Sequence, residues 1–519
     1  MSIARDVTTV GAATLTSRLL GFLRDAGVAA LLGAGALSDA YFAALQIPNL
    51  FRRLLAEGAL NSAYVPMSMR IRDENGAVAA RQFSEEVLGA MMASLVALAL
   101  LCVLFAPAIV HFLAPGFRSD GERFPLAVEF VRLSIAYVGA AGAVAVAASA
   151  LNAEGRVAAA AFGLIVFNAV LVTVVLTLIL SGAAATRDTA AVLSAAMAVA
   201  GAMQLVGVGA AWLRLDVRPR RLSLALSPAV RQFFAQAIPG VVAGGIPQLK
   251  LMAGAMVASS SQAAVSWLYY ANRLYELPLG VISIAISAVL VPAIAAGLRS
   301  GGGRAADAQS RALEIALGLA LPSAVAFALL SEAIAGGLFQ RGAFTARDTA
   351  MVAAALAAIS AGLPGHSLEK VLGAVSFAHE DTRTPMATAL CGLATAVAGA
   401  HVLFPHYGHV GIAAAIALSG WIGATLLAVI LWRRRWLVID GAAWRRTTRI
   451  VLATAIMGAA IAGGDAVLSS VLDVAASSLA RVGTLGLLVA AGLGVYLLAL
   501  QALGVTSIPT LLAAVRARL

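Results

Sequence analysis

Apolar runs long enough to cross a membrane dominate this chain of 519 residues. A helix needs about 20 mainly apolar residues to span the hydrocarbon core of a bilayer. Only 12% of the residues are charged, whereas an ordinary soluble domain carries about 25%. This composition excludes a soluble globular enzyme. The sequence predicts an all-α polytopic membrane protein with fourteen transmembrane helices, over residues 8–32, 38–65, 87–113, 126–151, 157–181, 187–213, 231–256, 263–296, 312–338, 348–376, 386–404, 409–432, 450–470 and 482–504.

The excess of basic residues indicates membrane topology rather than a nucleic-acid partner. The net charge is +11, from 36 lysines and arginines against 25 aspartates and glutamates. When both termini are placed in the cytoplasm, most basic loop residues fall on the cytoplasmic side, as the positive-inside bias requires. We therefore expect both termini in the cytoplasm and no binding of nucleic acid.

Two long, proline-interrupted spans indicate an internal duplication. The second span contains Tyr41 followed by Pro48, and the eighth contains Tyr269 followed by Pro278. Interrupted helices at matching places in two halves are the best pointer from sequence to a transport site. Two six-helix bundles followed by two helices explain this spacing. We expect an N-terminal lobe over residues 1–222, a C-terminal lobe over 223–440 and a final helix pair in 441–519.

Charged residues at bilayer depth are the candidate functional groups. A cation at the centre of a lipid-facing helix costs about 2.5–3.5 kcal/mol, so such residues normally face the bundle interior. Arginine suits phosphate because its planar fork donates two parallel hydrogen bonds. The cations that we interpret as lining a water-accessible site for an anionic ligand are Arg18, Arg24, Arg52 and Arg273. Those that we interpret as ion-paired or snorkelling are Arg53, Arg132 and Lys370.

The spacing of acids along each helix predicts which cations are compensated. Residues seven apart lie on one helix face, and residues four apart are neighbours. These spacings pair Arg18 with Asp25, Arg53 with Glu57 and Asn272 with Glu276. Arg24 and Arg52 have no acid at these spacings on their own helices, so we expect them to carry uncompensated charge.

Several of these residues lie in strings that resemble the MurJ/MviN-type lipid II flippases. The first-helix string is Ser17-Arg18-Leu19-Leu20-Gly21-Phe22-Leu23-Arg24-Asp25, and the second span carries Ser38-Asp39-Ala40-Tyr41-Phe42 and Pro48-Asn49-Leu50-Phe51-Arg52-Arg53-Leu54-Leu55-Ala56-Glu57-Gly58-Ala59. Later strings are Trp267-Leu268-Tyr269-Tyr270-Ala271-Asn272-Arg273-Leu274, Leu338-Phe339-Gln340-Arg341-Gly342-Ala343-Phe344-Thr345 and Asp381-Thr382-Arg383-Thr384-Pro385. The likeness covers the first twelve predicted spans.

The resemblance implies a fold, a substrate and roles for individual residues. It implies two six-helix lobes around a central cavity, with two further helices forming a lipid-facing groove. The implied substrate is lipid II, carried across the bacterial inner membrane for cell wall synthesis, with the synthesis machinery as a further partner. The implied substrate-binding arginines are Arg18, Arg24, Arg52 and Arg273. The implied gate or portal acids are Asp25, Asp39 and Glu57.

The chain departs from the family pattern at three places. Asn272 stands where members usually carry an acid beside the arginine equivalent to Arg273. Gly254 occupies the place where some members use an acid for a proposed sodium site, and Lys250 lies one turn earlier, which argues against sodium coupling. The pair His379-Glu380 replaces a different family string.

A transporter driven by membrane potential is the function that these features favour. No Walker-type loop is present, so we expect no ATP, cofactor or catalytic metal. A flippase for another undecaprenyl-linked oligosaccharide is the alternative within transport. A membrane enzyme of the same lipid pathway would need clustered catalytic groups, and the candidates are His401, His406 and His409 with His379-Glu380-Asp381.

Overall fold

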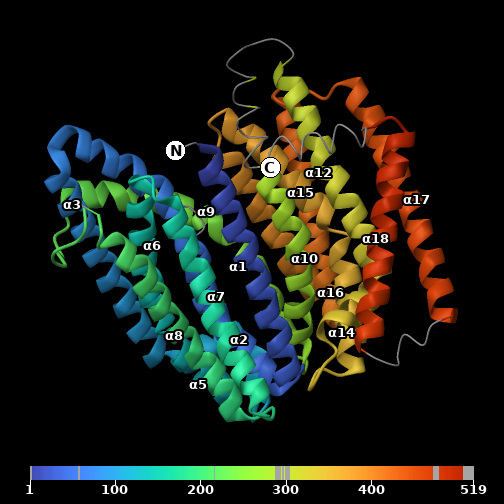
Figure 1. The fold of residues 1–519 in the computed structure, drawn as a ribbon, viewed down its shortest axis with the longest axis horizontal. Coiled ribbons are helices and arrows are strands. Elements are labelled where there is room, and N and C mark those ends of the chain that lie inside the picture. Colours follow the sequence, from blue (N-terminus) through green and yellow to red (C-terminus); the bar gives the residue numbers. More distant parts are fainter. Residues whose placement is uncertain are drawn as a thin grey trace. The chain divides into compact units, whose positions relative to one another are not determined.

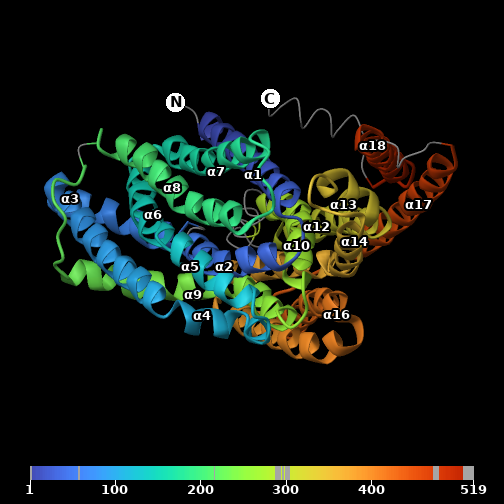
Figure 2. The same ribbon diagram turned by 90° about the horizontal axis from the view of Figure 1, so that it is seen from below.

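The computed structural model describes residues 3–56, 59–215, 217–286, 294, 297, 304–471 and 478–505. Within these residues the secondary structure is helical, and no strand occurs. The chain divides into two compact units, one of residues 1–266 with 342–344 and one of residues 267–341 with 345–519. Figure 1 and Figure 2 show the helices of each unit from two directions.

Unit 1 contains nine α-helices and a short 3-10 helix among its described residues. They are α1 (Ile3–Leu32), α2 (Ala36–Ala56), α3 (Ala59–Leu104), α4 (Ala106–Leu113), η1 (Pro115–Ser119), α5 (Arg123–Ser134), α6 (Tyr137–Ala153), α7 (Val157–Leu180), α8 (Arg187–Trp212) and α9 (Pro228–Ala258). The closest packing joins α1 to α7, α3 to α6, and α8 to both α6 and α7 (Figure 1).

Unit 2 contains most of α10 and all later described helices. They are α10 (Ala264–Ala285), α12 (Arg304–Leu329), α13 (Ser331–Phe339), α14 (Ala346–Ser360), α15 (Leu363–Ala378), α16 (Arg383–Arg433), α17 (Gly441–Val471) and α18 (Ser478–Ala502). The last two helices pack against each other, and α12 and α13 contact them in turn. The first three residues of α10 belong to unit 1.

The apolar helices confirm a multi-pass membrane protein, whereas the count of fourteen spans stays a prediction. Eight helical runs among the described residues are long and apolar enough to cross a membrane, or up to nine if the bent pair α14 and α15 forms one span. The predicted ends of α7 and α8 lie within one residue of the observed ends. The predicted turn between residues 404 and 409 is a kink inside α16, where Gly408 has a φ of 55°.

Five predicted spans each fall on two observed helices: 38–65, 87–113, 126–151, 312–338 and 348–376. The range 38–65 falls on α2 and α3, and residues 57–58 between them lie outside the described part. The range 87–113 is broken because α3 ends at Leu104 and α4 begins at Ala106, with a proline in its first turn. Proline lacks the backbone N–H that a helix interior requires, so the helix restarts there. Hydrophobicity alone does not reveal such a break.

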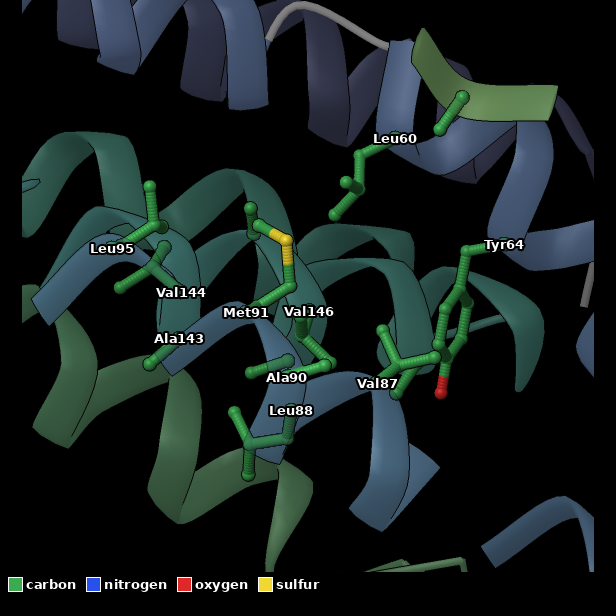
Figure 3. Close-up of a cluster of buried hydrophobic side chains, with 14 of the residues drawn as sticks. Leu60, Tyr64, Val87, Leu88, Ala90, Met91, Leu95, Ala143, Val144 and Val146 are labelled. Carbon is green, nitrogen blue, oxygen red and sulfur yellow. The ribbon is translucent and has the colours of Figure 1, made fainter. Parts of the chain in front are cut away.

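The core of unit 1 is built from α3, α6 and α9. Tyr64 and Val87 of α3 lie in one cluster with Val146 of α6 (Figure 3). The Tyr64 ring is fully buried, and its hydroxyl lies 2.6 Å from Oγ of Ser84. A buried tyrosine needs such a partner because an unpaired hydroxyl is costly to bury. α2 packs on this core through α6 and α9, whereas α1 packs on α7.

A glycine sets the distance between α1 and α7. A Cβ atom on Gly27 would lie 2.3 Å from Cγ1 of Val175. The two helix backbones therefore approach as closely as they do only because residue 27 has no side chain. This close approach brings the polar residues of α1 within reach of α7.

Candidate functional site

Arg24 of α1 is held by the acid that follows it in the sequence. Its Nε and Nη2 donate to Oδ1 of Asp25 at 2.9 and 2.7 Å. The Asp25 side chain is 2% exposed, whereas that of Arg24 is 17% exposed. The expectation that Arg24 carries uncompensated charge was therefore wrong. The spacing rules concern residues three, four or seven apart, and a long arginine side chain also reaches a neighbour directly beside it.

An asparagine on α7 orients the other side of the same guanidinium. Nη1 of Arg24 donates to Oδ1 of Asn168 at 3.5 Å, which is a long hydrogen bond. Nδ2 of Asn168 donates to Oγ of Ser17 at 3.0 Å, and Oγ of Ser17 donates to the Leu164 carbonyl at 3.2 Å. Because the amide nitrogen is engaged by Ser17, its oxygen faces Arg24. Asn168 was not predicted, although it is the single amide in an apolar helix.

The first-helix pairing of Arg18 with Asp25 does not form. Oδ1 of Asp25 accepts from Arg24 instead, and the Arg18 side chain is partly buried at a position two turns earlier. Arg18 and Arg24 both lie on α1. Of the two, only Arg24 has a described side-chain contact with α7, the hydrogen bond to Asn168.

Arg52 lies in the last turns of α2, after the proline at position 48 that interrupts this helix. Its side chain is partly buried, and its charge acts on the buried Tyr137 of α6. Arg52 thus belongs to the electrostatic surroundings of the unit 1 core. Glu57, the acid predicted to pair with Arg53, lies outside the described residues.

Arg273 of α10 belongs to unit 2 and pairs with an acid on its own helix. Its Nη1 lies 3.4 Å from Oε2 of Glu276, and the two side chains are 24% and 23% exposed. Nδ2 of Asn272 donates to Oε1 of the same glutamate at 3.3 Å. The predicted contact between Asn272 and Glu276 is therefore confirmed. At this place the amide of Asn272 donates to the acid that also holds Arg273.

Asp39 is a fully buried acid in the first turn of α2. Its side chain is fully buried, and its oxygens accept from the backbone N–H of Ala263 at 2.8 Å and of Ser266 at 2.9 Å. The Ser266 hydroxyl adds a bond of 2.6 Å. A carboxylate at a helix N-terminus satisfies N–H groups that have no partner within the helix and complements the helix dipole. Asp39 therefore caps the start of α10, within the part that belongs to unit 1.

Arg123 is the cationic partner of Asp39, and sequence reasoning missed it. Nη1 of Arg123 lies 3.3 Å from Oδ2 of Asp39, and Nε lies 2.6 Å from Oδ2 of Asp120. The same Nη1 donates to the Ser261 carbonyl at 3.1 Å, and the guanidinium lies over the Phe117 ring. Arg123 precedes the span predicted over residues 126–151, so its sequence position indicates a loop charge. The separation of 84 positions between it and Asp39 hides the pairing.

The histidines considered for an enzyme have structural partners. Nε2 of His409 lies 2.9 Å from the Met351 carbonyl, and its ring contacts the Trp267 ring. His379 stacks on Trp436, with ring centroids 4.3 Å apart. Among the described residues no group of three or more His, Cys, Asp or Glu side chains is placed to hold a metal.

The structure also describes the surroundings of Lys250 and His379, two other positions where the chain departs from the family pattern. Lys250 in α9 is buried. In the turn after α15, hydrogen bonds from Thr384 and the charge of Arg434 lower the pKa of Asp381 to about 2. The Arg434 guanidinium also lies over Trp436, the ring on which His379 stacks. His379 therefore packs in the turn between α15 and α16.

Comparison with protein families and curated proteins gives one consistent match. A family model described as "Lipid II flippase MurJ" matches residues 28–483. The chain is 38% identical over 502 residues to "Probable lipid II flippase MurJ" of Rhizobium tropici, covering 96% of this chain and 93% of the relative. It is 40% identical over 506 residues to the protein of the same description from Rhizobium meliloti (strain 1021), again covering 96% and 93%.

Solved structures with the same fold include a flippase and a drug transporter. The structure titled "Lipid II flippase MurJ, inward closed conformation" aligns with a TM-score of 0.79 at 22% identity, covering 94% of this chain and 97% of that chain. An inward-facing multidrug resistance MATE family transporter of the MOP superfamily aligns with a TM-score of 0.65 at 17% identity, covering 81% and 94%. At these identities the likeness concerns the fold alone.

Proposed function

Because this chain belongs to the lipid II flippase MurJ family, we propose that it moves lipid II from the inner to the outer leaflet of the bacterial cytoplasmic membrane. The observation that carries this proposal is the family match over residues 28–483. The family consists of transporters, so the substrate is relocated with no bond made or broken.

The proposed binding groups for the pyrophosphate of lipid II are Arg18, Arg24, Arg52 and Arg273. Two features support this assignment. Arg24 is partly exposed, and Asp25 and Asn168 fix the plane of its guanidinium. Arg273 is about a quarter exposed on α10. A planar guanidinium of fixed orientation is suited to the bidentate binding of phosphate oxygens.

The proposed gate and portal acids are Asp25, Asp39 and Glu57. The contacts of Asp39 support a gating role, because they hold the first turn of α10, the helix that carries Arg273. A change that breaks these bonds would release the start of that helix. We assign Asp25 the role of releasing its arginine to a phosphate group. The role of Glu57 rests on the family resemblance only.

The proposed mechanism is alternating access driven by membrane potential. We assign the lobes to residues 1–222 and 223–440, the lipid-facing groove to residues 441–519, and both termini to the cytoplasm. An inside-negative potential favours outward movement of an anion by about 2.3 kcal/mol per charge per 100 mV. The wall-synthesis machinery that uses lipid II is a further partner in this proposal.

The test is transfer of labelled lipid II by the purified chain in proteoliposomes. We expect the wild-type protein to move lipid II, to move it faster with an inside-negative potential, and to leave its mass unchanged. Arg132→Ala is the control, because this arginine is exposed and its described hydrogen bond is to the Val103 carbonyl. Chemically altered lipid II, or no transfer at either potential, would overturn the proposal. Preferred transfer of a lipid carrying a different oligosaccharide would favour the alternative substrate.

A further inference from the structure

The connection between α8 and α9, residues 213–227, has one side fixed to the protein and another side turned outward. On the inner side, Leu215 and Val217 are buried in the core of unit 1. Oε1 of Glu85 accepts from the backbone N–H of Arg220 at 2.8 Å. The backbone of Ser223 lies so close to α3 that a Cβ atom on Gly89 would be 2.0 Å from its carbonyl oxygen. The conformation of this connection is therefore set by α3.

The outer side carries a row of leucines. Leu222, Leu224 and Leu226 are 65%, 70% and 54% exposed. They occupy alternate positions of the connection, and we call them the leucine row. Ser223 between them turns inward, and its N–H donates to the Glu85 carbonyl at 3.4 Å. Three exposed leucines held in one row form an apolar surface that water alone does not favour.

Four exposed arginines accompany this row, at positions 214, 218, 220 and 221. Arg221 lies 3.5 Å from the buried Glu85 carboxylate, yet its own side chain is 76% exposed. The described part of the connection thus combines a cationic patch with an apolar row. We call this combined surface, formed by the four arginines with Leu222, Leu224 and Leu226, the 213–227 patch.

The position of the patch along the chain indicates what covers it. The candidate span α8 ends at Trp212, and α9 begins at Pro228. The connection therefore lies where a spanning helix leaves the hydrocarbon core. Lipid headgroups and the first acyl carbons meet at this depth, and basic segments beside a span attract anionic lipids.

We propose that the 213–227 patch binds anionic phospholipid, with the leucine row in the boundary between headgroups and acyl chains and the arginines on lipid phosphates. Guanidinium groups complement phosphate charge and geometry, and their apolar stems lie along the membrane surface. This binding is independent of the transported substrate. It anchors the connection between α8 and α9 to the membrane surface.

A fluorescent probe at the centre of the row tests the proposal in the full chain. Leu224→Cys, in a chain whose Cys102 and Cys391 are replaced by serine, carries a polarity-sensitive bimane. The labelled protein is placed in nanodiscs of phosphatidylcholine alone or with an equal part of phosphatidylglycerol. We expect blue-shifted emission and quenching by a spin label on the upper acyl chain, with stronger quenching in the anionic discs. Val78→Cys is the control, because Val78 is 67% exposed near the acidic residues Asp73 and Glu74.

The contribution of the arginines is measured by titrating the detergent-solubilised Leu224→Cys protein with short-chain phosphatidylglycerol. Arg218→Gln should weaken binding about fivefold, since a basic residue near an anionic surface contributes about 1 kcal/mol. Arg132→Gln should leave the titration unchanged. A probe at 224 that is as water-exposed as the one at 78 would overturn the proposal. Equal quenching in neutral and anionic discs, or shielding without quenching by lipid, would also overturn it, the last by pointing to a protein partner.

Discussion

Two ion pairs in unit 1 are built from the same chemical groups and differ in their surroundings. Arg24 and Asp25 are adjacent on α1, and their side chains are 17% and 2% exposed. Arg123 and Asp39 come from α5 and α2, and their side chains are 5% and 0% exposed. The second pair is enclosed by further contacts to Asp120, Ser261 and Phe117.

The difference teaches which arginine is suited to ligand exchange and which to holding the fold. A buried charge depends on its partner, because removing one member leaves the other without compensation in a medium of low dielectric constant. A partly exposed charge loses less when its partner changes. We therefore expect the Arg123 pair to control stability and the Arg24 pair to control transport.

The largest effect should follow from Arg123→Leu, which leaves the fully buried Asp39 without its cation. We expect the free energy of unfolding to fall by about 3–5 kcal/mol. Denaturant unfolding of the detergent-solubilised chain measures the change. Arg132→Leu is the control on the same helix, because Arg132 is exposed, and it should change stability by about 0.5 kcal/mol or less. Equal free energies of unfolding for the two variants would show that the buried Asp39 does not depend on the charge of Arg123.

Arg24→Ala should have the next largest effect, on transport. Because it also removes the cation paired with the buried Asp25, the free energy of unfolding is measured beside it and the transfer rate is taken per folded protein. Hydrogen bonds to charged groups contribute about 1.5–3 kcal/mol, so lipid II transfer in proteoliposomes should fall by about 10- to 100-fold. Arg24→Lys keeps the charge but loses the planar fork, and it should retain an intermediate rate. A rate close to that of the wild type for Arg24→Ala would remove Arg24 from the binding groups.

The sequence was sufficient to predict uninterrupted helices such as α7 and α8, but not the breaks within other spans or the interactions between distant helices. α7 and α8 were predicted to within one residue because each is an apolar run that ends at polar or glycine-containing turns. The kink at Gly76 inside α3, where φ is 84°, lies in the polar stretch between the spans predicted over 38–65 and 87–113, but its conformation was not predicted.

The candidate site was predicted in the same partial way. The cost of burying charge selected Arg24 and Arg273, which lie on α1 and α10, and their role in binding stays a prediction. Helical spacing found the contact between Asn272 and Glu276, but it missed the pairing of Arg24 with its immediate neighbour. Asn168 was visible as an isolated amide, whereas its bond to Arg24 depends on how α1 packs on α7.

Asp25→Asn should sharpen the comparison. Asparagine has the same size as aspartate but pairs more weakly with Arg24, so it competes less with the ligand. The Asp25 carboxylate occupies Nε and Nη2 of Arg24, and a phosphate group must replace it. We expect about fivefold tighter apparent affinity for lipid II, from about 1 kcal/mol of lost competition, together with a lower maximal rate because release is slower. Initial rates at varied lipid II concentration separate the two effects. Weaker affinity in this variant would contradict the exchange of partners.

The smallest effect should come from Asn168→Ala, which removes the contact between α7 and Arg24 and leaves the pair with Asp25 in place. A neutral hydrogen bond contributes about 0.5–1.5 kcal/mol, and the Arg24 contact is long at 3.5 Å, so the transfer rate should fall about twofold to fivefold. Thr173→Val on the same helix is the control, because its hydroxyl donates only to the Ala169 carbonyl within α7 among the described contacts. If both variants slow transport equally, the loss reflects α7 itself and not the orientation of Arg24. If Asn168→Ala instead lowers the rate as far as Arg24→Ala, the amide is a binding group, and the accessible pair extends from α1 onto α7.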